Sequence, residues 1–235
     1  MAESKKLHEM IARYKKVSTA AVCDILDKMG YPCQTLSANF RPLDNSMSMA
    51  GPAYTIKGFN STLGGSKTSV PDVQMFREFY DGCVIVMETG CHRMAPWGDN
   101  RSVSAKCRGA QGIVIDGATR DAQQICELGG FACFTLFLTP VGSGGEARFK
   151  IEALQVPVNM HGQLIETVVV HPGDFIVGDR DGIVVVPQNI LEEVLVAAER
   201  LEEIEKELRD GIVAGEDRET LYKRIPRFAH VRRAE

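Results

Sequence analysis

The sequence predicts an α/β protein built around a largely parallel β-sheet. Between residues 71 and 138, short apolar runs alternate with segments of helical character. The runs at 83–87, 112–115 and 131–138 are apolar almost throughout, which is typical of parallel strands that are covered on both faces. Parallel neighbours need a crossover connection, and the helical segments at 99–108 and 121–128 supply it.

The bulk composition is that of an ordinary globular protein. The chain has 235 residues, of which 44% are hydrophobic and 25% are charged. We expect a single domain over 1–235, with a core at about 17–187, an N-terminal helix at 3–15 and a C-terminal helical extension at 188–235. The formal net charge of −4 argues against a nucleic-acid partner.

Cysteine usage and hydropathy indicate a cytoplasmic protein. The seven cysteines include no CxxC pair, and most lie in apolar runs, as reduced core thiols do. The charged N-terminus lacks the apolar core of a secretion signal. No apolar run approaches the roughly 18 residues of a membrane span, so we expect no membrane association.

The first 70 residues predict two helices and a strand. Apolar residues recur at helical spacing near the start, at Leu7, Met10, Ile11 and Tyr14. A second helix is expected to begin at the capping residues Ser18 and Thr19 and to end at Gly30. Residues 50–59 predict a strand, and the Gly-, Ser- and Thr-rich stretch at 60–69 predicts a loop.

The middle of the chain carries the alternating elements. A helix at 71–80 leads into the strand at 83–87, and the turn-forming residues at 88–98 predict a loop. The helix at 99–108, the strand at 112–115 and the helix at 121–128 follow in order. The pair Gly129–Gly130 ends that last helix before the apolar strand at 131–138.

After Pro140 the pattern changes. The stretch GSGGEARFK at 142–150 predicts a flexible loop. Four short strands with tight turns are then expected to form an antiparallel or mixed layer against the first half, at 155–160, 166–170, 174–178 and 183–187. A long helix with an apolar stripe should run from Asn189 to about Arg209, and residues 216–235 should form a short helix and a tail.

Charged residues gather just after the strand at 112–115. Asp116, Gly117, Arg120 and Asp121 follow it within a few positions. Ligands of open α/β sheets bind at the carboxyl ends of the strands. A guanidinium beside a carboxylate can hold an anionic substrate and a divalent cation side by side, which is what an enzyme needs to stabilise an enolate.

Each of these residues also has a purely structural interpretation. Asp121 is a hard oxygen ligand suited to Mg²⁺ or Mn²⁺, but it could instead cap the helix that begins at DAQQI. Arg120 could form an ordinary surface salt bridge, and Gly117 could be a simple turn glycine rather than a point of close ligand approach.

The loop that precedes the helix at 99–108 offers a second group of candidates. Asp99 could hold a metal-bound water or could cap the helix. Free backbone amides of Asn100 and Arg101 at the helix N-terminus would form an anion site for a keto-acid carboxylate.

Taken together, these residues resemble the RraA-like family, which includes divalent-metal-dependent pyruvate aldolases of the 4-hydroxy-4-methyl-2-oxoglutarate/4-carboxy-4-hydroxy-2-oxoadipate type. The resemblance covers about residues 17–210. Four stretches carry it: VSTAAVCDILDKMG at 17–30, GPAYTIKG at 51–58, WGDNRSVSAKCRGAQGIVIDGATRD at 97–121 and HPGDFIVGDRDGIVVVP at 171–187. It implies a swivelling α/β/α sandwich with helical N- and C-terminal extensions, assembled as a trimer or hexamer with active sites between subunits.

The resemblance also implies roles for individual residues. Asp121 corresponds to the metal-binding aspartate, Arg120 to the substrate-binding and catalytic arginine, and Asp99 to the catalytic acidic residue that holds a metal-bound water. Asn100 and Arg101 correspond to the positions whose backbone amides grip the pyruvyl group, although the aldolases have small or apolar residues at both.

The substrate-binding set is completed by two glycines, Gly98 and Gly117. In these aldolases a carboxylate from a late helix of the neighbouring subunit also reaches the site. Three residues are candidates for it here: Glu199, Glu202 and Glu203.

The implied reaction is a class II-type aldol cleavage that depends on Mg²⁺ or Mn²⁺. A 4-hydroxy-2-oxo acid would give pyruvate and a carbonyl product, and oxaloacetate could be decarboxylated at the same site because both reactions pass through the same enolate. Two alternatives stand beside it. Some RraA-type proteins bind and inhibit a ribonuclease without catalysis, and a Schiff-base aldolase would use Lys57, Lys67 or Lys106.

Overall fold

The computed structural model describes residues 2–60, 69–91, 93–144 and 148–233, so most of the loop expected at 60–69 lies outside the described residues. Its helices are α1 (Ala2–Tyr14), α2 (Thr19–Met29), α3 (Asp72–Glu78), α4 (Asp99–Lys106), α5 (Ala122–Glu127), α6 (Leu191–Val213), α7 (Arg218–Arg224) and the 3₁₀ turn η2 (Gln188–Ile190). Its strands are β1 (Arg41–Pro42), β2 (Met49–Asn60), β3 (Val84–Cys91), β4 (Gly112–Thr119), β5 (Ala132–Leu138), β6 (Phe149–Leu154), β7 (Val158–His161), β8 (Thr167–Val170), β9 (Phe175–Gly178) and β10 (Ile183–Val186).

One sheet dominates the molecule, with strand order β1-β5-β4-β3-β2-β9-β10 and β6 paired with β2. The predicted parallel arrangement is confirmed for the four strands from β2 to β5. The expected separate β-layer is partly wrong, because β9 and β10 join this sheet and the hairpin β7–β8 forms a sheet of its own. The reason is the 12-residue length of β2, whose first residues pair with β9 and whose later residues pair with β3 and β6.

The sheet separates two apolar clusters because side chains alternate along each strand. Tyr54 and Ile56 of β2 point into the outer cluster, which α3, α4 and α5 cover. Met49 and Ala53 of the same strand belong to the inner cluster, which the β7–β8 hairpin closes. Both faces of the parallel strands are therefore covered, as their continuous apolar character predicts.

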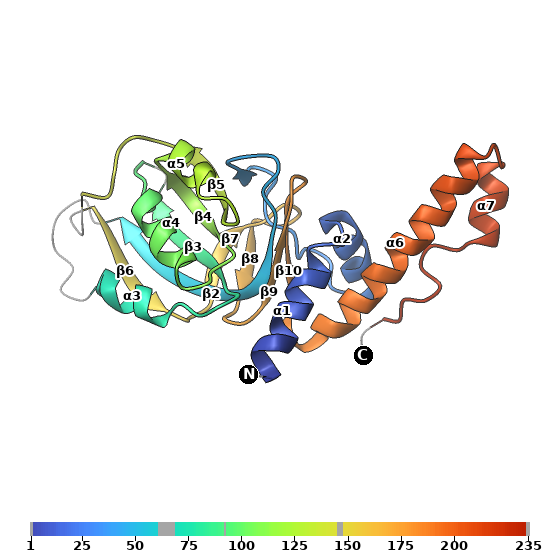
Figure 1. Ribbon diagram of the computed structural model, residues 1–235, viewed down its shortest axis with the longest axis horizontal. Helices are drawn as coiled ribbons and strands as arrows, with labels where there is room; N and C mark the ends of the chain where they lie inside the picture. The colour runs from blue at the N-terminus through green and yellow to red at the C-terminus, as the bar shows by residue number, and fades with distance from the viewer. Residues whose placement is uncertain (1, 61–68, 92, 145–147, 234–235) are drawn as a thin grey trace.

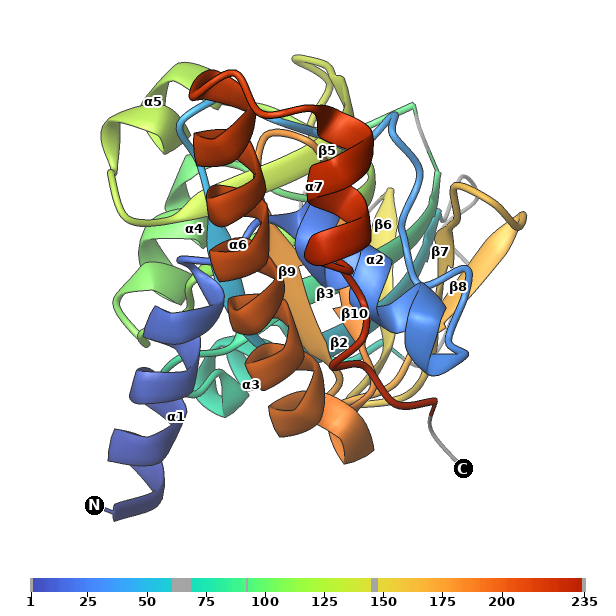
Figure 2. The ribbon, with the colours of Figure 1, turned by 90° about the vertical axis from the view of Figure 1, so that its right-hand side faces the viewer.

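The remaining helices pack at the β9–β10 end of the sheet. Apolar residues of α1, α2 and α6 form a third cluster with Phe175, Val177, Val184 and Val186. The predicted apolar stripe of the long helix is confirmed, since Val194, Leu195, Ala198, Leu201, Ile204 and Leu208 are all buried. In Figure 1, α6 lies at the opposite end of the molecule from α4 and α5. Figure 2 looks onto α6, with α1 and α7 beside it. None of the described helices combines the length and apolar character that crossing a bilayer requires.

The predicted start and end of α2 are confirmed. The Ser18 hydroxyl accepts a hydrogen bond from the Ala21 amide, and Gly30 ends the helix in the left-handed region with φ of 95°. The Ser18 hydroxyl also donates to the Glu202 carboxylate of α6 at 2.7 Å, so the cap ties the two helices together.

Replacing Ser18 with alanine should lower the free energy of unfolding by about 1–2 kcal/mol, because the helix cap and the contact with α6 are lost together. Urea unfolding followed by circular dichroism measures this change. Ser4→Ala is the matched control, since Ser4 is exposed within α1. An unfolding free energy equal to that of Ser4→Ala would remove Ser18 from the contacts that stabilise α2.

Several element boundaries differ from those predicted. β3 continues to Cys91, so the expected loop at 88–98 is shorter, and its residue His92 lies outside the described residues. The stretch expected to be a flexible loop at 142–150 ends inside β6, which pairs with β2. Partners far away in the sequence recruit these segments into the sheet, and local composition does not reveal such partners.

Candidate active site

The site is built at the carboxyl end of β4, which is longer than predicted. The strand runs for eight residues, all buried, and passes through Asp116 and Gly117, where a turn was expected. The Asp116 carboxylate accepts hydrogen bonds from the backbone amide of His161 at 2.9 Å and pairs with Nδ1 of the same residue at 2.6 Å. The Gly117 carbonyl accepts one from the Thr135 hydroxyl at 2.9 Å. These partners let the strand continue to Thr119, so the turn interpretation of Gly117 is wrong, while its contact with substrate stays a prediction.

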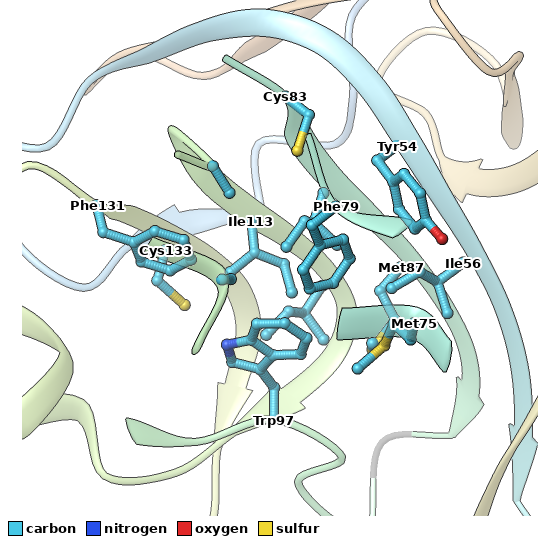
Figure 3. Close-up of a cluster of buried hydrophobic side chains, with 14 of the residues drawn as sticks. Tyr54, Ile56, Met75, Phe79, Cys83, Met87, Trp97, Ile113, Phe131 and Cys133 are labelled. Atoms are coloured by element: carbon cyan, nitrogen blue, oxygen red, sulfur yellow. The ribbon is translucent and has the colours of Figure 1, made fainter. Parts of the chain in front are cut away.

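The segment before α4 is pinned alongside the end of β4. The Trp97 carbonyl accepts hydrogen bonds from the Thr119 hydroxyl at 3.1 Å and from the Arg120 amide at 3.2 Å. The Trp97 indole ring is buried in the outer cluster (Figure 3). Its Nε1 donates a hydrogen bond to the Ser102 hydroxyl at 2.8 Å. This anchoring brings the two ends of the 97–121 segment together, and it sets Gly98 and Asp99 beside Arg120 and Asp121.

Asp121 occupies the N-cap position of α5, as its structural interpretation predicts, but its carboxylate does not cap the helix. Its backbone lies in the left-handed region with φ of 57°, and its side chain makes no cap hydrogen bond. Its Oδ2 atom lies 3.3 Å from Nε of Arg120 and accepts a long hydrogen bond, 3.4 Å, from the Asp99 amide. A left-handed aspartate costs about 1–3 kcal/mol of strain, and such strain gathers at functional sites.

Two glycines surround the Arg120–Asp121 pair. A Cβ atom at Gly98 would lie 2.5 Å from Oδ2 of Asp121 and 3.2 Å from Cγ of Arg120. A Cβ atom at Gly142 would lie 2.3 Å from Nη1 of Arg120. The 2.5 Å and 2.3 Å distances are shorter than real Cβ contacts, so the two side chains occupy space that exists only because residues 98 and 142 are glycines.

Helix α4 begins directly at the site. Its N-cap residue is Gly98, which has no capping side chain, so the expectation that Asp99 could itself be the N-cap is wrong. The Asp99 carboxylate accepts a hydrogen bond from the Asn100 amide at 2.6 Å. The Asn100 amide, expected to be free, is therefore paired with the neighbouring carboxylate, and its contact with a substrate anion stays a prediction.

These residues line one small cavity of about 140 Å³. Its lining residues are Ala95, Trp97, Gly98, Asp99, Asn100, Arg101, Arg120, Asp121 and Ser143. The structure thus brings together six of the predicted site residues, at 98–101 and 120–121. Gly142 and Ser143 escaped sequence reasoning because they lie in a Gly- and Ser-rich stretch that was interpreted as a flexible loop.

The residues of the cavity fit a magnesium-type ion. Mg²⁺ is usually held by one or two protein carboxylates and keeps several waters or substrate oxygens. Asp121 supplies a carboxylate that is not used by the helix cap, and Asp99 supplies a second on the same cavity. Within the described ranges, no group of three or more His, Cys, Asp or Glu residues is placed to hold a metal ion.

The late-helix carboxylates have partners within their own chain. Glu199 is held by the Arg13 guanidinium at 2.6 Å, and Glu202 accepts from the Ser18 hydroxyl at 2.7 Å. Glu203 is exposed and pairs with Arg200, one turn before it on α6. Whether any of the three reaches the site of a neighbouring subunit stays a prediction.

The sequence pattern of the RraA-like family, described as Aldolase/RraA, matches residues 19–185. The chain belongs to this family. The uncharacterised protein MJ0644 of Methanocaldococcus jannaschii is 31% identical to this chain over 175 residues. The match covers 74% of this chain and 78% of MJ0644. A protein of Halalkalibacterium halodurans, provisionally named a 4-hydroxy-4-methyl-2-oxoglutarate aldolase, is 29% identical over 88% of this chain and 91% of that protein.

Solved structures agree with the family assignment. RraAS2 of Streptomyces coelicolor, described as an unusual member of the RNase ES inhibitor RraA family, superposes with a TM-score of 0.73. It is 28% identical, and the match covers 86% of this chain and 96% of that one. The RraA-like type of α/β fold predicted from the sequence is confirmed. The family therefore holds both proteins named as aldolases and proteins named as ribonuclease inhibitors.

Proposed function

We propose that this protein is a divalent-metal-dependent carbon–carbon lyase that cleaves a 4-hydroxy-2-oxo acid into pyruvate and a carbonyl compound. The observation that carries the proposal is the Asp121 carboxylate, which is released from helix capping and lies 3.3 Å from the Arg120 guanidinium on a shared cavity. A relative that is provisionally named an aldolase, and whose match covers 88% of this chain, supports the proposal.

In this proposal Arg120 binds the 2-oxo acid end of the substrate. Asp99 accepts the proton of the 4-hydroxyl group, through a water molecule, as the C3–C4 bond breaks. The electron pair of that bond moves towards C2, and the keto oxygen gains negative charge. The guanidinium stabilises this charge because it lies in a partly enclosed site. Protonation at C3 then gives pyruvate.

Asp121 would hold Mg²⁺ or Mn²⁺ directly, and Asp99 would hold it through a bound water. When bound, the ion supplies Lewis-acid charge at the substrate's oxygens. Oxaloacetate is a second substrate under this proposal, because loss of CO₂ from it leaves the same enolate. We further propose that the active form is a homo-oligomer, a trimer or hexamer, in which Glu199, Glu202 or Glu203 of one subunit approaches the site of another.

Removal of divalent metal should abolish pyruvate release. We expect EDTA to lower turnover of a 4-hydroxy-2-oxo acid to the background rate, and Mg²⁺ or Mn²⁺ to restore it, because the ion provides charge stabilisation that Arg120 alone cannot replace. Lactate dehydrogenase coupled to NADH oxidation measures the released pyruvate. Turnover that survives EDTA and is trapped by borohydride would instead support a lysine Schiff base.

The two Schiff-base candidates among the described residues, Lys106 and Lys57, do not line the cavity. The Lys106 ammonium group is exposed and donates to the Leu128 carbonyl at 2.6 Å, away from the cavity lining. Lys57 lies on β2 and also does not line the cavity, while Lys67 lies outside the described residues.

A regulator of ribonuclease is the second candidate function. The likeness to RraAS2 favours it, because that protein is described as a member of an RNase inhibitor family. A regulator would need neither Asp121 nor a metal ion. Full structural integrity together with no pyruvate release from any 2-oxo acid tested, with or without Mg²⁺, would favour this second function over the lyase.

A further inference from the structure

Strand β4 contains a bulge just before the candidate active site. Ile115 pairs with Thr135 of β5. The next pair joins Ala118 to Phe137, so β4 holds one more residue than β5 between the two pairs. The register of β4 with β3 shifts at the same level of the sheet. Bulges disrupt the hydrogen-bonded ladder, re-aim the residues that follow them and are frequent beside active sites.

Two buried hydroxyl groups bind the backbone of the bulge. From β3, the Thr89 hydroxyl donates a hydrogen bond to the Asp116 carbonyl. From β5, the Thr135 hydroxyl donates to the Gly117 carbonyl at 2.9 Å, and it lies farther, 3.1 Å, from the Phe137 carbonyl. Thr89 is 0% exposed and Thr135 is 4% exposed, so solvent would not replace either contact if it were lost. Both neighbouring strands therefore hold the irregular residues of β4.

The Asp116 side chain fixes the bulge from a third direction. Its carboxylate is 6% exposed and is held by the backbone amide and Nδ1 of His161 on β7. β7 belongs to the hairpin that closes the inner cluster. Contacts from β3, β5 and β7 therefore converge on Asp116 and Gly117, two residues that have the composition of a turn.

The bulge is connected to the site by a short stretch of backbone. Gly117 precedes Arg120 by three positions. The Arg120 amide and the Thr119 hydroxyl both donate to the Trp97 carbonyl on the other side of the cavity. The glycines packed against Arg120 and Asp121 leave little room for these side chains to shift. A change in the direction of β4 at Gly117 would therefore misplace both of them.

We propose that Thr89 and Thr135 are positioning residues for the candidate active site. Their hydroxyl groups keep the bulge of β4 in one conformation, and that conformation sets where Arg120 and Asp121 lie. The inference rests on the proposed function for its kinetic test. The competing explanation is a structural role alone, since each hydroxyl also satisfies a buried carbonyl.

The test replaces each threonine separately with valine, which has nearly the same shape but no hydroxyl, and with serine, which keeps the hydroxyl. Thr55→Val is the matched control. Thr55 is buried in β2, and its hydroxyl donates to the Val156 carbonyl at 2.6 Å, away from the cavity lining. Every valine variant thus loses one hydroxyl–carbonyl bond of a buried threonine, and only the place of the loss differs.

Three properties of the full chain are measured. The first is kcat/KM for pyruvate release, and the second is the dissociation constant of Mn²⁺, followed by electron paramagnetic resonance without substrate. The third is the quenching by acrylamide of the fluorescence of Trp97, which is the single tryptophan of the chain. Melting temperatures show how much stability each variant loses.

We expect Thr89→Val and Thr135→Val to lower kcat/KM by about 10-fold, because a displacement of about 1 Å can cost about 100-fold and a smaller one costs less. Mn²⁺ should bind about 10-fold more weakly, as when groups that orient a metal ligand are removed. Trp97 should be quenched more readily, because the partners of its carbonyl shift. Thr55→Val should lower the melting temperature by a similar amount but keep wild-type values of all three properties, and the serine variants should restore them.

Wild-type kcat/KM and Mn²⁺ affinity in folded Thr89→Val and Thr135→Val proteins would overturn the inference, as would an equal loss in Thr55→Val. Failure of both valine variants to fold beside a folded Thr55→Val would also overturn it, since the hydroxyls would then serve the sheet as a whole. The lyase proposal is judged separately. If the wild type releases no pyruvate, that proposal fails, and Mn²⁺ affinity and Trp97 quenching still decide the role of the two threonines.

Discussion

Alanine at Arg120 or at Asp121 should lower kcat/KM for pyruvate release by about 100-fold or more, the typical cost of removing one electrostatic stabiliser from an active site. In the proposed mechanism each residue stabilises the charge that develops on the substrate's keto oxygen, Arg120 directly and Asp121 through the ion it would hold. The Asp121 carboxylate takes no part in capping α5, so its loss should act on catalysis rather than on the helix.

The chain contains its own control for this experiment. Arg180 and Asp181 repeat the same residue order in the exposed turn between β9 and β10. Arg180→Ala and Asp181→Ala should retain wild-type kinetics, measured in the same coupled assay. The conservative variants Arg120→Lys and Asp121→Asn separate loss of charge from loss of volume. Folded Arg120→Ala and Asp121→Ala proteins with wild-type turnover would remove both residues from the mechanism.

Local chemistry explains why the 97–121 segment could be predicted. A helix preceded by a glycine and an apolar strand followed by charged residues can each be recognised from a short stretch of sequence. The juxtaposition of Gly98 and Asp99 with Arg120 and Asp121 follows from parallel packing, because helix α4 leads directly into β4. The same reasoning predicted α2 and α6, whose caps and apolar stripe are also local.

Long-range partners explain what could not be predicted. Asp116 and Gly117 have the composition of a turn, and it is the bonds from His161 and Thr135 that keep them in β4. His161 lies 45 residues away from Asp116, and no local sequence pattern predicts the contact between them. β9 and β10 join the main sheet for a similar reason, because the long strand β2 offers an edge to β9, and β10 then pairs with β9.

The cavity lining also combines residues that local sequence predicts with residues that distant segments contribute. Arg101 was singled out for its backbone amide, yet its side chain is the unusual feature, since its partner Asp72 comes from another helix. Gly142 reaches Arg120 from the connection after β5, far along the chain. Sequence reasoning found the charged groups of the site because their chemistry is distinctive, and it missed the residues whose role is to leave room for them.

Gly98 provides the sharpest test of that spatial role. Its φ of −163° is an extended conformation that alanine adopts without strain, so Gly98→Ala introduces no backbone penalty. The new Cβ would lie 2.5 Å from Oδ2 of Asp121, and one of the two must move. Because Asp121 has a short side chain on a backbone fixed in the left-handed region, we expect the carboxylate to be displaced from its position beside Arg120.

A shift of about 1 Å in a catalytic group can cost about 100-fold in rate, so kcat/KM of Gly98→Ala should fall by about that factor. The melting temperature should change little if the carboxylate moves and the backbone does not. Gly182→Ala is the matched control, because a Cβ there meets nothing within 4 Å. A large loss of stability in Gly98→Ala would mean that the Trp97–Thr119 anchoring gives way first. Unchanged kinetics in a stable Gly98→Ala protein would mean that catalysis does not depend on where the Asp121 carboxylate lies, which is incompatible with a metal ion held there.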